Sequence, residues 1–158
     1  MRLQRQDGYT LVEVTLVLMI LALLLAVGMV SLLGARKGAQ NRAAQALARE
    51  AVTSAKTVFS ATLTYAAVTV PALRAAEPSL VFVESTQESD SPRIVSVASV
   101  DSSTFIAAVR SSTGTCFFIR DEIATGKAPG HLGTTFAAVT QEEPCRANAP
   151  PPEFVDRW

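Results

Sequence analysis

Residues 14–33 read VTLVLMILALLLAVGMVSLL, a run of uncharged residues that begins directly after Glu13. A helix rises 1.5 Å per residue, so this run predicts a helix about 30 Å long, which is the thickness of a bilayer core. The positive mean hydropathy of the chain, +0.28, comes mainly from this segment. The sequence therefore divides into a membrane-length apolar part and an ordinary globular remainder.

Glu13 stands at the start of this apolar run. A charged side chain within a bilayer costs several kcal/mol unless it is paired, which makes it a candidate functional group. The alternative is a glutamate at the membrane interface, where the dipole of a helix N-terminus favours an anion. Residues 1–8 are polar and contain Arg2 and Arg5, so the charge by itself leaves both interpretations open.

Two simpler kinds of N-terminal segment fit this region less well. A secretory signal peptide has an apolar run of roughly 7–15 residues followed by a small-residue cleavage site. The run at 14–33 is longer and follows a carboxylate. A plain single-pass anchor fits the length, but it gives no physical reason for Glu13.

The residues Gly8-Tyr9-Thr10-Leu11-Val12-Glu13 and the apolar run after them closely resemble the N-terminus of type IV prepilins and pseudopilins. The resemblance implies that residues 1–8 are a leader peptide ending at Gly8. It implies that a membrane peptidase cuts after Gly8 and methylates the new amine of Tyr9. Glu13 then occupies the fifth mature position, where the family carries a glutamate. Tyr9 departs from the phenylalanine that is most common at the first mature position, but it keeps an aromatic ring.

The resemblance also implies how the N-terminal helix, residues 9–35, is used. In the family, the N-terminal amine and the glutamate pair between subunits while the apolar helices bundle into a filament core. An unpaired buried charge costs several kcal/mol and a complete pair roughly breaks even, so pairing of Tyr9 with Glu13 would set the register. The implied partners are a prepilin peptidase/N-methyltransferase, sister pilin subunits, an inner-membrane assembly platform and the lipid bilayer.

The resemblance implies that residues 36–158 form an extracytoplasmic globular head. From 39 to 65 small and apolar residues recur at three- and four-residue spacing, which predicts an amphipathic helix. Pro71 and Pro78 are expected to bracket a loop that ends the helical region. Runs rich in Val, Ile, Phe and Thr then predict strands at 80–83, 94–100, 104–110 and 115–120.

The fold class predicted for the head is α+β. The last three strands are expected to form an antiparallel meander, because short turn-like segments connect them. A long N-terminal helix packed on a small antiparallel sheet within residues 80–120 is also the architecture of the pilin head. The segment between 120 and 145 shows little secondary-structure signal.

Cys116 and Cys145 are the only cysteines. Disulfides persist outside the cytoplasm, and C-terminal disulfide-bounded regions occur in many pilins. We therefore expect these two residues to be joined, bounding the region 116–145. The alternative is a pair of buried free thiols.

The sequence offers little support for catalysis, metal binding or nucleic-acid binding. His131 is the only histidine and lies in a glycine-rich loop, and two cysteines with one histidine do not make a zinc site. Calcium binding by Asp121, Glu122, Glu142 and Glu143 is an alternative to solvated surface charge, but their spacing does not resemble a calcium loop. The 14 basic residues balance 14 acidic ones, so no specific nucleic acid is expected.

These observations predict a structural protein without enzymatic activity or cofactor. The protein is expected to be a filament subunit. Before assembly it is a single-pass membrane protein, and after assembly it is part of a cell-surface or periplasm-spanning filament. Two alternatives remain: a pseudopilin of a type II secretion or competence system, and a membrane-anchored extracytoplasmic binding domain that never assembles. The proline-rich tail, residues 150–158, carries Phe154 and Trp158, which are expected either to dock on the head or a partner or to be mobile.

Overall fold

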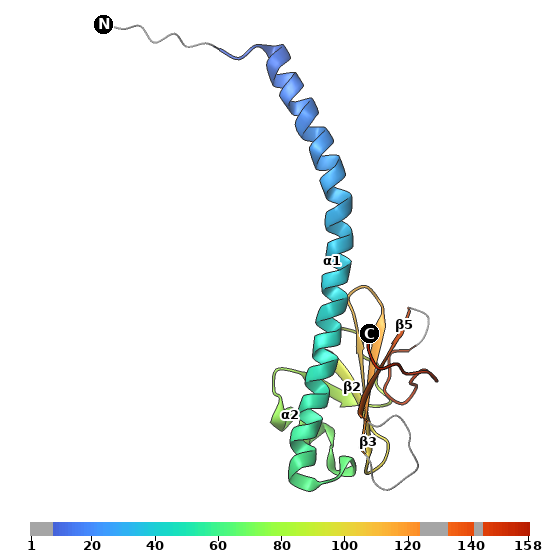
Figure 1. Cartoon of the computed structure of the whole chain (residues 1–158). Helices are drawn as coiled ribbons and strands as arrows, with labels where there is room; N and C mark the ends of the chain where they lie inside the picture. Colours follow the sequence, from blue (N-terminus) through green and yellow to red (C-terminus); the bar gives the residue numbers. More distant parts are fainter. Residues whose placement is uncertain (1–7, 124–132, 141–143) are drawn as a thin grey trace, which may run out of the picture. The chain divides into compact units, whose positions relative to one another are not determined.

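The computed structural model describes residues 8–123, 133–140 and 144–158, which form a long helix, two short helices and five strands (Figure 1). In chain order these are α1 (Leu11–Thr62), η1 (Tyr65–Ala67), α2 (Val70–Ala76), β1 (Val81–Glu84), β2 (Ile94–Ser99), β3 (Thr104–Arg110), β4 (Cys116–Glu122) and β5 (Gly133–Val139).

The chain forms two compact units, divided between Gly38 and Ala39. The first contains the N-terminal half of α1, residues 11–38. The second is the head, residues 39–158, which contains the C-terminal half of α1, residues 39–62, together with the sheet.

The C-terminal half of α1 packs on one face of the sheet because its buried side chains are small. Alanine adds little bulk beyond Cβ, so the helix backbone lies close to the strands. Across from it are buried aromatic and branched side chains of the sheet, including Phe105, Val109 and Ile119. The helix contributes Ala44, Ala48, Ala51, Val52 and Ala55 to this inner core. The predicted α+β class, a long N-terminal helix on a small sheet, is confirmed.

The sheet has the strand order β1-β2-β3-β4-β5. As predicted, β2, β3 and β4 form an antiparallel meander. The antiparallel sheet predicted at 80–120 holds for β2, β3 and β4 but not for β1, which runs parallel to β2, with Val81 opposite Ile94. Residues 85–93 make this return possible: nine extended residues reach about 30 Å, whereas a strand as short as β1 is only about 13 Å long.

Two elements were not expected from the sequence. β5 lies within the segment that showed little signal, and it pairs with β4 along its whole length. Its two alanines and initial glycine weaken the pattern, so pairing with β4 decides the structure. The loop expected between Pro71 and Pro78 is instead mostly α2. Thr69 caps this helix, its side chain accepting from the N–H of Ala72, and Pro71 is tolerated because the first turn has free N–H groups.

The second face of the sheet is covered by chain from the C-terminal region. A cluster of apolar side chains on this face, which we call the outer cluster, includes Cys145 and Ala147 from the segment after β5. The strands contribute Ile106, Ala108, Cys116, Phe118 and Ala137. The Cys116–Cys145 disulfide, with a Cα–Cα distance of 5.5 Å, joins this segment to β4.

Candidate processing and assembly site

Thr10 fixes where α1 begins. Its side-chain oxygen accepts a hydrogen bond from the backbone N–H of Glu13 (3.2 Å), and its carbonyl accepts from the N–H of Val14 (3.2 Å). This is the geometry of an N-cap, in which a hydroxyl satisfies an N–H that the helix leaves free. Thr10 and Glu13 also have the spacing of a capping box. The helix therefore starts at Leu11, directly after its N-cap Thr10.

The Gly8–Tyr9 bond lies just outside the helix in exposed chain. The Tyr9 side chain is 83% exposed. A Cβ placed on Gly8 would meet no other atom within 4 Å. Among the described residues, the bond that the sequence predicts as the cleavage site is thus exposed. Arg2 and Arg5 of the expected leader lie outside the described residues.

Glu13 is the acidic residue in the first turn of α1. Its side chain is exposed, and among the described residues no cation or hydrogen-bond donor contacts its carboxylate. The dipole of the helix N-terminus stabilises an anion at this position. The carboxylate is therefore placed favourably within its own helix and still has free acceptor capacity for an outside partner.

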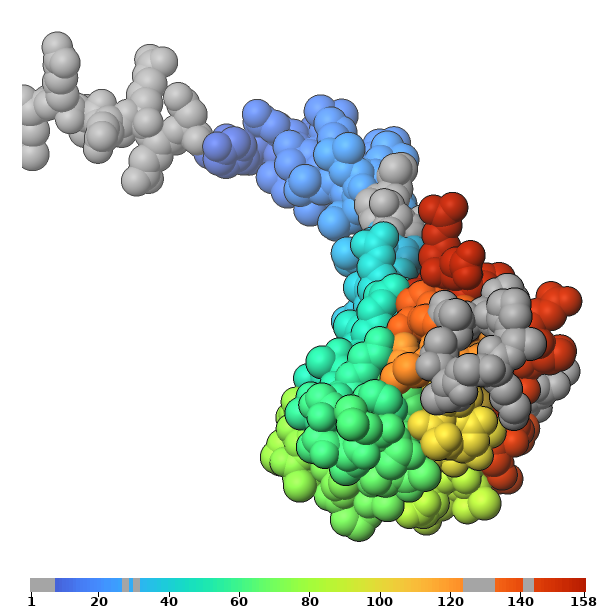
Figure 2. Space-filling view, turned by 60° about the horizontal axis from the view of Figure 1, so that its bottom comes forward, coloured from blue at the N-terminus to red at the C-terminus, as the bar shows by residue number. Residues whose placement is uncertain are grey.

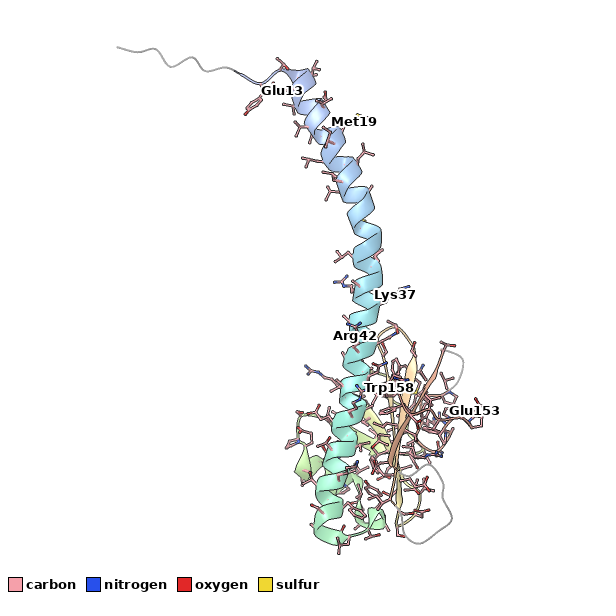
Figure 3. All side chains as sticks on the ribbon, viewed as in Figure 1. Glu13, Met19, Lys37, Arg42, Glu153 and Trp158 are labelled. Atoms are coloured by element: carbon pink, nitrogen blue, oxygen red, sulfur yellow. A yellow bond between two sulfur atoms is a disulfide. The ribbon has the colours of Figure 1, made fainter. Side chains whose placement is uncertain are left out.

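Tyr9 and Glu13 lie together along one face of the N-terminal half of α1. They line an open groove of about 410 Å³ with Val14, Val17 and Leu18. Figure 3 shows Glu13 at the first turn of α1 and Met19 further along the same helix. The groove thus combines a phenol, a carboxylate and aliphatic side chains.

Large apolar side chains surround the N-terminal half of α1. Their exposed fractions range from 47% to 81%. They are Leu11, Val12, Val14, Leu16, Val17, Leu18, Met19, Ile20, Leu21, Leu23, Leu24, Leu25, Met29, Leu32 and Leu33. An exposed apolar surface of this extent is typical of a site that binds another protein or a membrane.

The predicted membrane segment, 14–33, includes residues whose side chains lie outside the described set: Val27, Gly28, Val30 and Ser31. Among the residues that the structure does describe, no helix is both long enough and apolar enough to cross a membrane.

The comparison with protein families gives one finding, at this same end of the chain. The prokaryotic N-terminal methylation motif matches residues 3–29, a stretch that contains Gly8, Tyr9, Thr10 and Glu13. The chain carries the type IV pilin and pseudopilin signature. Neither a curated protein nor a solved structure matches the chain. The pilin signature therefore ends at residue 29, within the N-terminal half of α1, and does not extend into the head.

The predicted pairing of Cys116 with Cys145 is present in the structure. Glu88 lies beside it: its carboxylate accepts from the N–H of Cys145 (3.3 Å) and forms an ion pair with Arg110. The Cys145 N–H, together with Arg110, holds the pKa of Glu88 below its ordinary value. Ser89 adds a hydrogen bond from its N–H to the carbonyl of Cys145 (2.9 Å). The disulfide is thus held from the loop before β2 as well as from β4.

Asp121 is a buried carboxylate whose environment the sequence analysis predicted wrongly. Its side chain is only 1% exposed, whereas solvated surface charge was expected. It accepts hydrogen bonds from three different elements: the hydroxyl of Tyr65 (2.5 Å), the hydroxyl of Thr134 (2.6 Å) and the ammonium of Lys56 (2.8 Å). This Asp121 network joins α1, η1, β4 and β5 on the inner face of the sheet.

The electrostatics of the Asp121 network follow from its burial. Burial raises the pKa of Asp121, but the hydrogen bonds from Lys56, Thr134 and Tyr65 outweigh it and hold the pKa below its ordinary value. Burial and the bond to Asp121 raise the pKa of Tyr65. Asp121 is therefore a charged structural group at neutral pH, with its acceptor sites already occupied by protein donors.

The remaining candidates for a chemical site are not brought together. Among the described residues, no group of three or more His, Cys, Asp or Glu side chains is placed to hold a metal ion. His131, Glu142 and Glu143 lie outside the described residues. One sequence signal could have located the Asp121 network. Asp121 alternates with Phe117 and Ile119 along the strand, so it occupies an inward-facing position among apolar residues.

Proposed function

We propose that this chain is a pilin-like structural subunit, made as a precursor whose leader, residues 1–8, is removed after Gly8 and whose new amine on Tyr9 is methylated. The observation that carries the proposal is the methylation motif at residues 3–29. The local geometry supports it, because an exposed Gly8–Tyr9 bond is followed at once by a capped helix with Glu13 in its first turn. A prepilin peptidase/N-methyltransferase would be the processing partner.

Before assembly, we place the N-terminal helix, residues 9–35, in the lipid bilayer as a single membrane-spanning segment. The twenty uncharged residues at 14–33 and the exposed apolar side chains along α1 support this placement. The head is proposed to face the extracytoplasmic side, where a disulfide such as Cys116–Cys145 persists.

Assembly is proposed to use Glu13 and the Tyr9 amine as a pair between sister subunits, delivered from an inner-membrane assembly platform. The Glu13 carboxylate is exposed and has free acceptor capacity, and the groove beside it is lined by apolar residues. When apolar helices bundle, each Glu13 and each amine leaves water. Pairing between subunits then compensates both charges, since either one alone would be costly to bury.

A pseudopilin of a type II secretion or competence system is the nearest second candidate, because the methylation motif is shared by pilins and pseudopilins. The third candidate is an anchored binding domain that never assembles. The exposed carboxylate of Glu13 favours assembly over simple anchoring, because an anchor does not need a charge at this position.

The test compares Glu13→Ala with Thr15→Ala in cells that express the processing and assembly machinery. Glu13→Ala would leave an uncompensated amine in each added subunit, a cost of about 3–5 kcal/mol. Even 3 kcal/mol weakens each addition roughly a hundredfold. Thr15→Ala is the matched control, because the Thr15 hydroxyl bonds only to the carbonyl of Val12 in its own helix (2.9 Å).

Sheared filaments and membranes are collected separately, probed for the head, and their N-terminal peptides are mapped by mass. We expect wild type and Thr15→Ala in the filament fraction, starting at a singly methylated Tyr9, and Glu13→Ala only in membranes. Normal filaments from Glu13→Ala would contradict the role of Glu13. A wild-type chain that starts at Met1 or after Ala26 or Ala35 would contradict the proposed processing.

A further inference from the structure

The tail, residues 150–158, closes the open edge of the sheet. Among the described residues β5 is the last strand in the sheet order, so no other strand of that set pairs with its outer edge. Val155 forms one bridge with the middle of this edge: its N–H donates to the carbonyl of Phe136, and its carbonyl accepts from the Phe136 N–H, both at 2.7 Å. Figure 2 shows atoms of the C-terminal residues, in red, beside orange atoms of the head.

The tail is anchored on both faces of the sheet. Phe154 packs against the outer cluster, where the guanidinium of Arg120 lies 4.5 Å from its ring centroid. Trp158 packs against the inner core, with its ring centroid 5.0 Å from those of Phe117 and Phe136. Figure 3 shows Trp158 beside α1 and Glu153 on the far side of the sheet. The tail therefore crosses the edge of β5 from one face to the other.

The edge that the tail crosses is only partly satisfied. Alternate residues of a strand present their N–H and C=O groups to the same side, so Thr134 and Ala138 face outward with Phe136. Within the described chain, the tail bridges to Phe136 alone. Between the tail and the end of β5 is a groove of about 430 Å³, lined by residues that include Ala138, Pro151 and Pro152.

β5 lacks the side chains that would keep its edge from pairing with another strand. Its sequence, GTTFAAV, contains no charged residue and no proline. These are the side chains that usually protect an edge strand from pairing with another chain. Two identical strands related by a two-fold axis pair antiparallel and satisfy both edges at once. Such pairing would need the Phe136 groups that Val155 occupies.

We propose that the tail is a clasp that keeps the β5 edge from pairing with β5 of a second copy of this chain. The tail and the second copy compete for the same backbone groups of Phe136, so the head pairs at this edge only when the clasp is released. The opposite edge of the sheet is protected separately, because the side chain of Arg74 donates to the carbonyl of Phe82 in β1 (2.7 Å). The proposal does not depend on processing at Gly8.

The test measures the oligomeric state of the full chain in detergent by sedimentation and native mass spectrometry. A variant that ends at Ala149 is expected to double the mass of the wild-type species. Adding Ala138→Pro to that variant should restore the wild-type mass. Ala138 is exposed and its N–H faces outward, so proline there removes an edge donor without breaking the pairing with β4.

Val155→Pro provides a second variant if loss of Trp158 prevents folding. It removes the N–H that donates to Phe136 and retains both aromatic anchors. A folded Val155→Pro chain should show a dimer fraction between those of the wild type and the shortened variant, and Ala138→Pro should suppress it. A folded variant of either kind with the wild-type mass would overturn the proposal. Association that persists after Ala138→Pro would also overturn it, because the contact would then lie elsewhere.

Discussion

The two halves of α1 belong to one continuous helix but bury different amounts of their surface. In the C-terminal half, Ala44, Ala48, Ala51 and Ala55 are completely buried against the sheet. In the N-terminal half, the described large side chains between Leu11 and Leu33 are exposed. The more hydrophobic half is thus the one whose described large side chains stay exposed.

The difference shows that side-chain size, as well as hydrophobicity, decides which part of a helix is used inside the chain. Alanines on one face let a helix lie close to a sheet. Leucines and valines around the whole circumference cannot all be buried by one sheet, and they are typical of a helix surrounded by lipid or by other helices. This surface is the basis for proposing that the N-terminal half is completed by a bilayer and then by sister subunits.

Removing the disulfide is expected to give the largest difference in stability between the head and the N-terminal half of α1. Cys116→Ala with Cys145→Ala should lower the free energy of unfolding of the head by about 3–4 kcal/mol, because the bond closes a long loop in the unfolded chain. Trp158 is the only tryptophan and packs in the head. Its fluorescence during chemical denaturation in detergent therefore reports the head.

Circular dichroism on the same samples provides the control, because the N-terminal half of α1 contains no cysteine and should remain helical. An unchanged fluorescence midpoint in the double variant would mean that the segment around Cys145 is held by Glu88 and Ser89 alone. A simultaneous loss of all helix signal would mean that the two units unfold together.

A smaller effect comes from placing the same substitution in each half of α1. Ala48→Leu inserts bulk into a completely buried position and should cost about 1–3 kcal/mol of head stability. Ala22→Leu occupies an exposed position in the N-terminal half and should leave the head unchanged. Denaturation followed by Trp158 fluorescence measures both, and equal effects of the two substitutions would remove the distinction between the halves.

The smallest effect is the pH dependence of the Asp121 network. The pKa of Asp121 is lower in the folded head than in the unfolded chain, so the unfolded chain binds more protons as the pH falls. The stability contributed by Asp121 is fully present above its unfolded pKa of about 3.9 and is lost as the pH drops toward the folded value. Asp121→Asn should therefore flatten the fall in stability between pH 6 and pH 3.

The pH measurement uses the difference between wild type and Asp121→Asn, because Glu77, Glu88 and Asp101 also have lowered pKa values and contribute in both proteins. Lys56 and Tyr65 face Asp121 directly and remain in the variant. Parallel pH curves for the two proteins would show that Asp121 is not a net contributor to acid stability.

The sequence predicted those parts of the fold that local patterns encode. Three- and four-residue spacing located the C-terminal half of α1, and runs of Val, Ile and Phe located β2, β3 and β4. The direction of β1 was not predictable, because it depends on the path of residues 85–93 rather than on any residue of the strand. β5 was missed because its stability comes from pairing with β4 more than from its own side chains.

For the candidate site, the motif identified Gly8, Tyr9 and Glu13 as residues to examine, and their roles in processing and assembly remain predictions. The role of Thr10 as N-cap was visible in its spacing from Glu13 but was not used. Asp121 was misjudged because its burial depends on Lys56 and Thr134, which are distant in sequence. Such a network exists only once the tertiary structure has formed.

The N-cap at Thr10 has a consequence for the reach of the mature N-terminus. If the chain is cut after Gly8, only Tyr9 and the N-cap Thr10 lie between the new positive charge and the first turn of α1. Two extended residues span about 7 Å. The positive charge would then have little freedom to move relative to the helix. A neighbouring carboxylate would therefore have to be brought to it by translation and rotation of the whole helix.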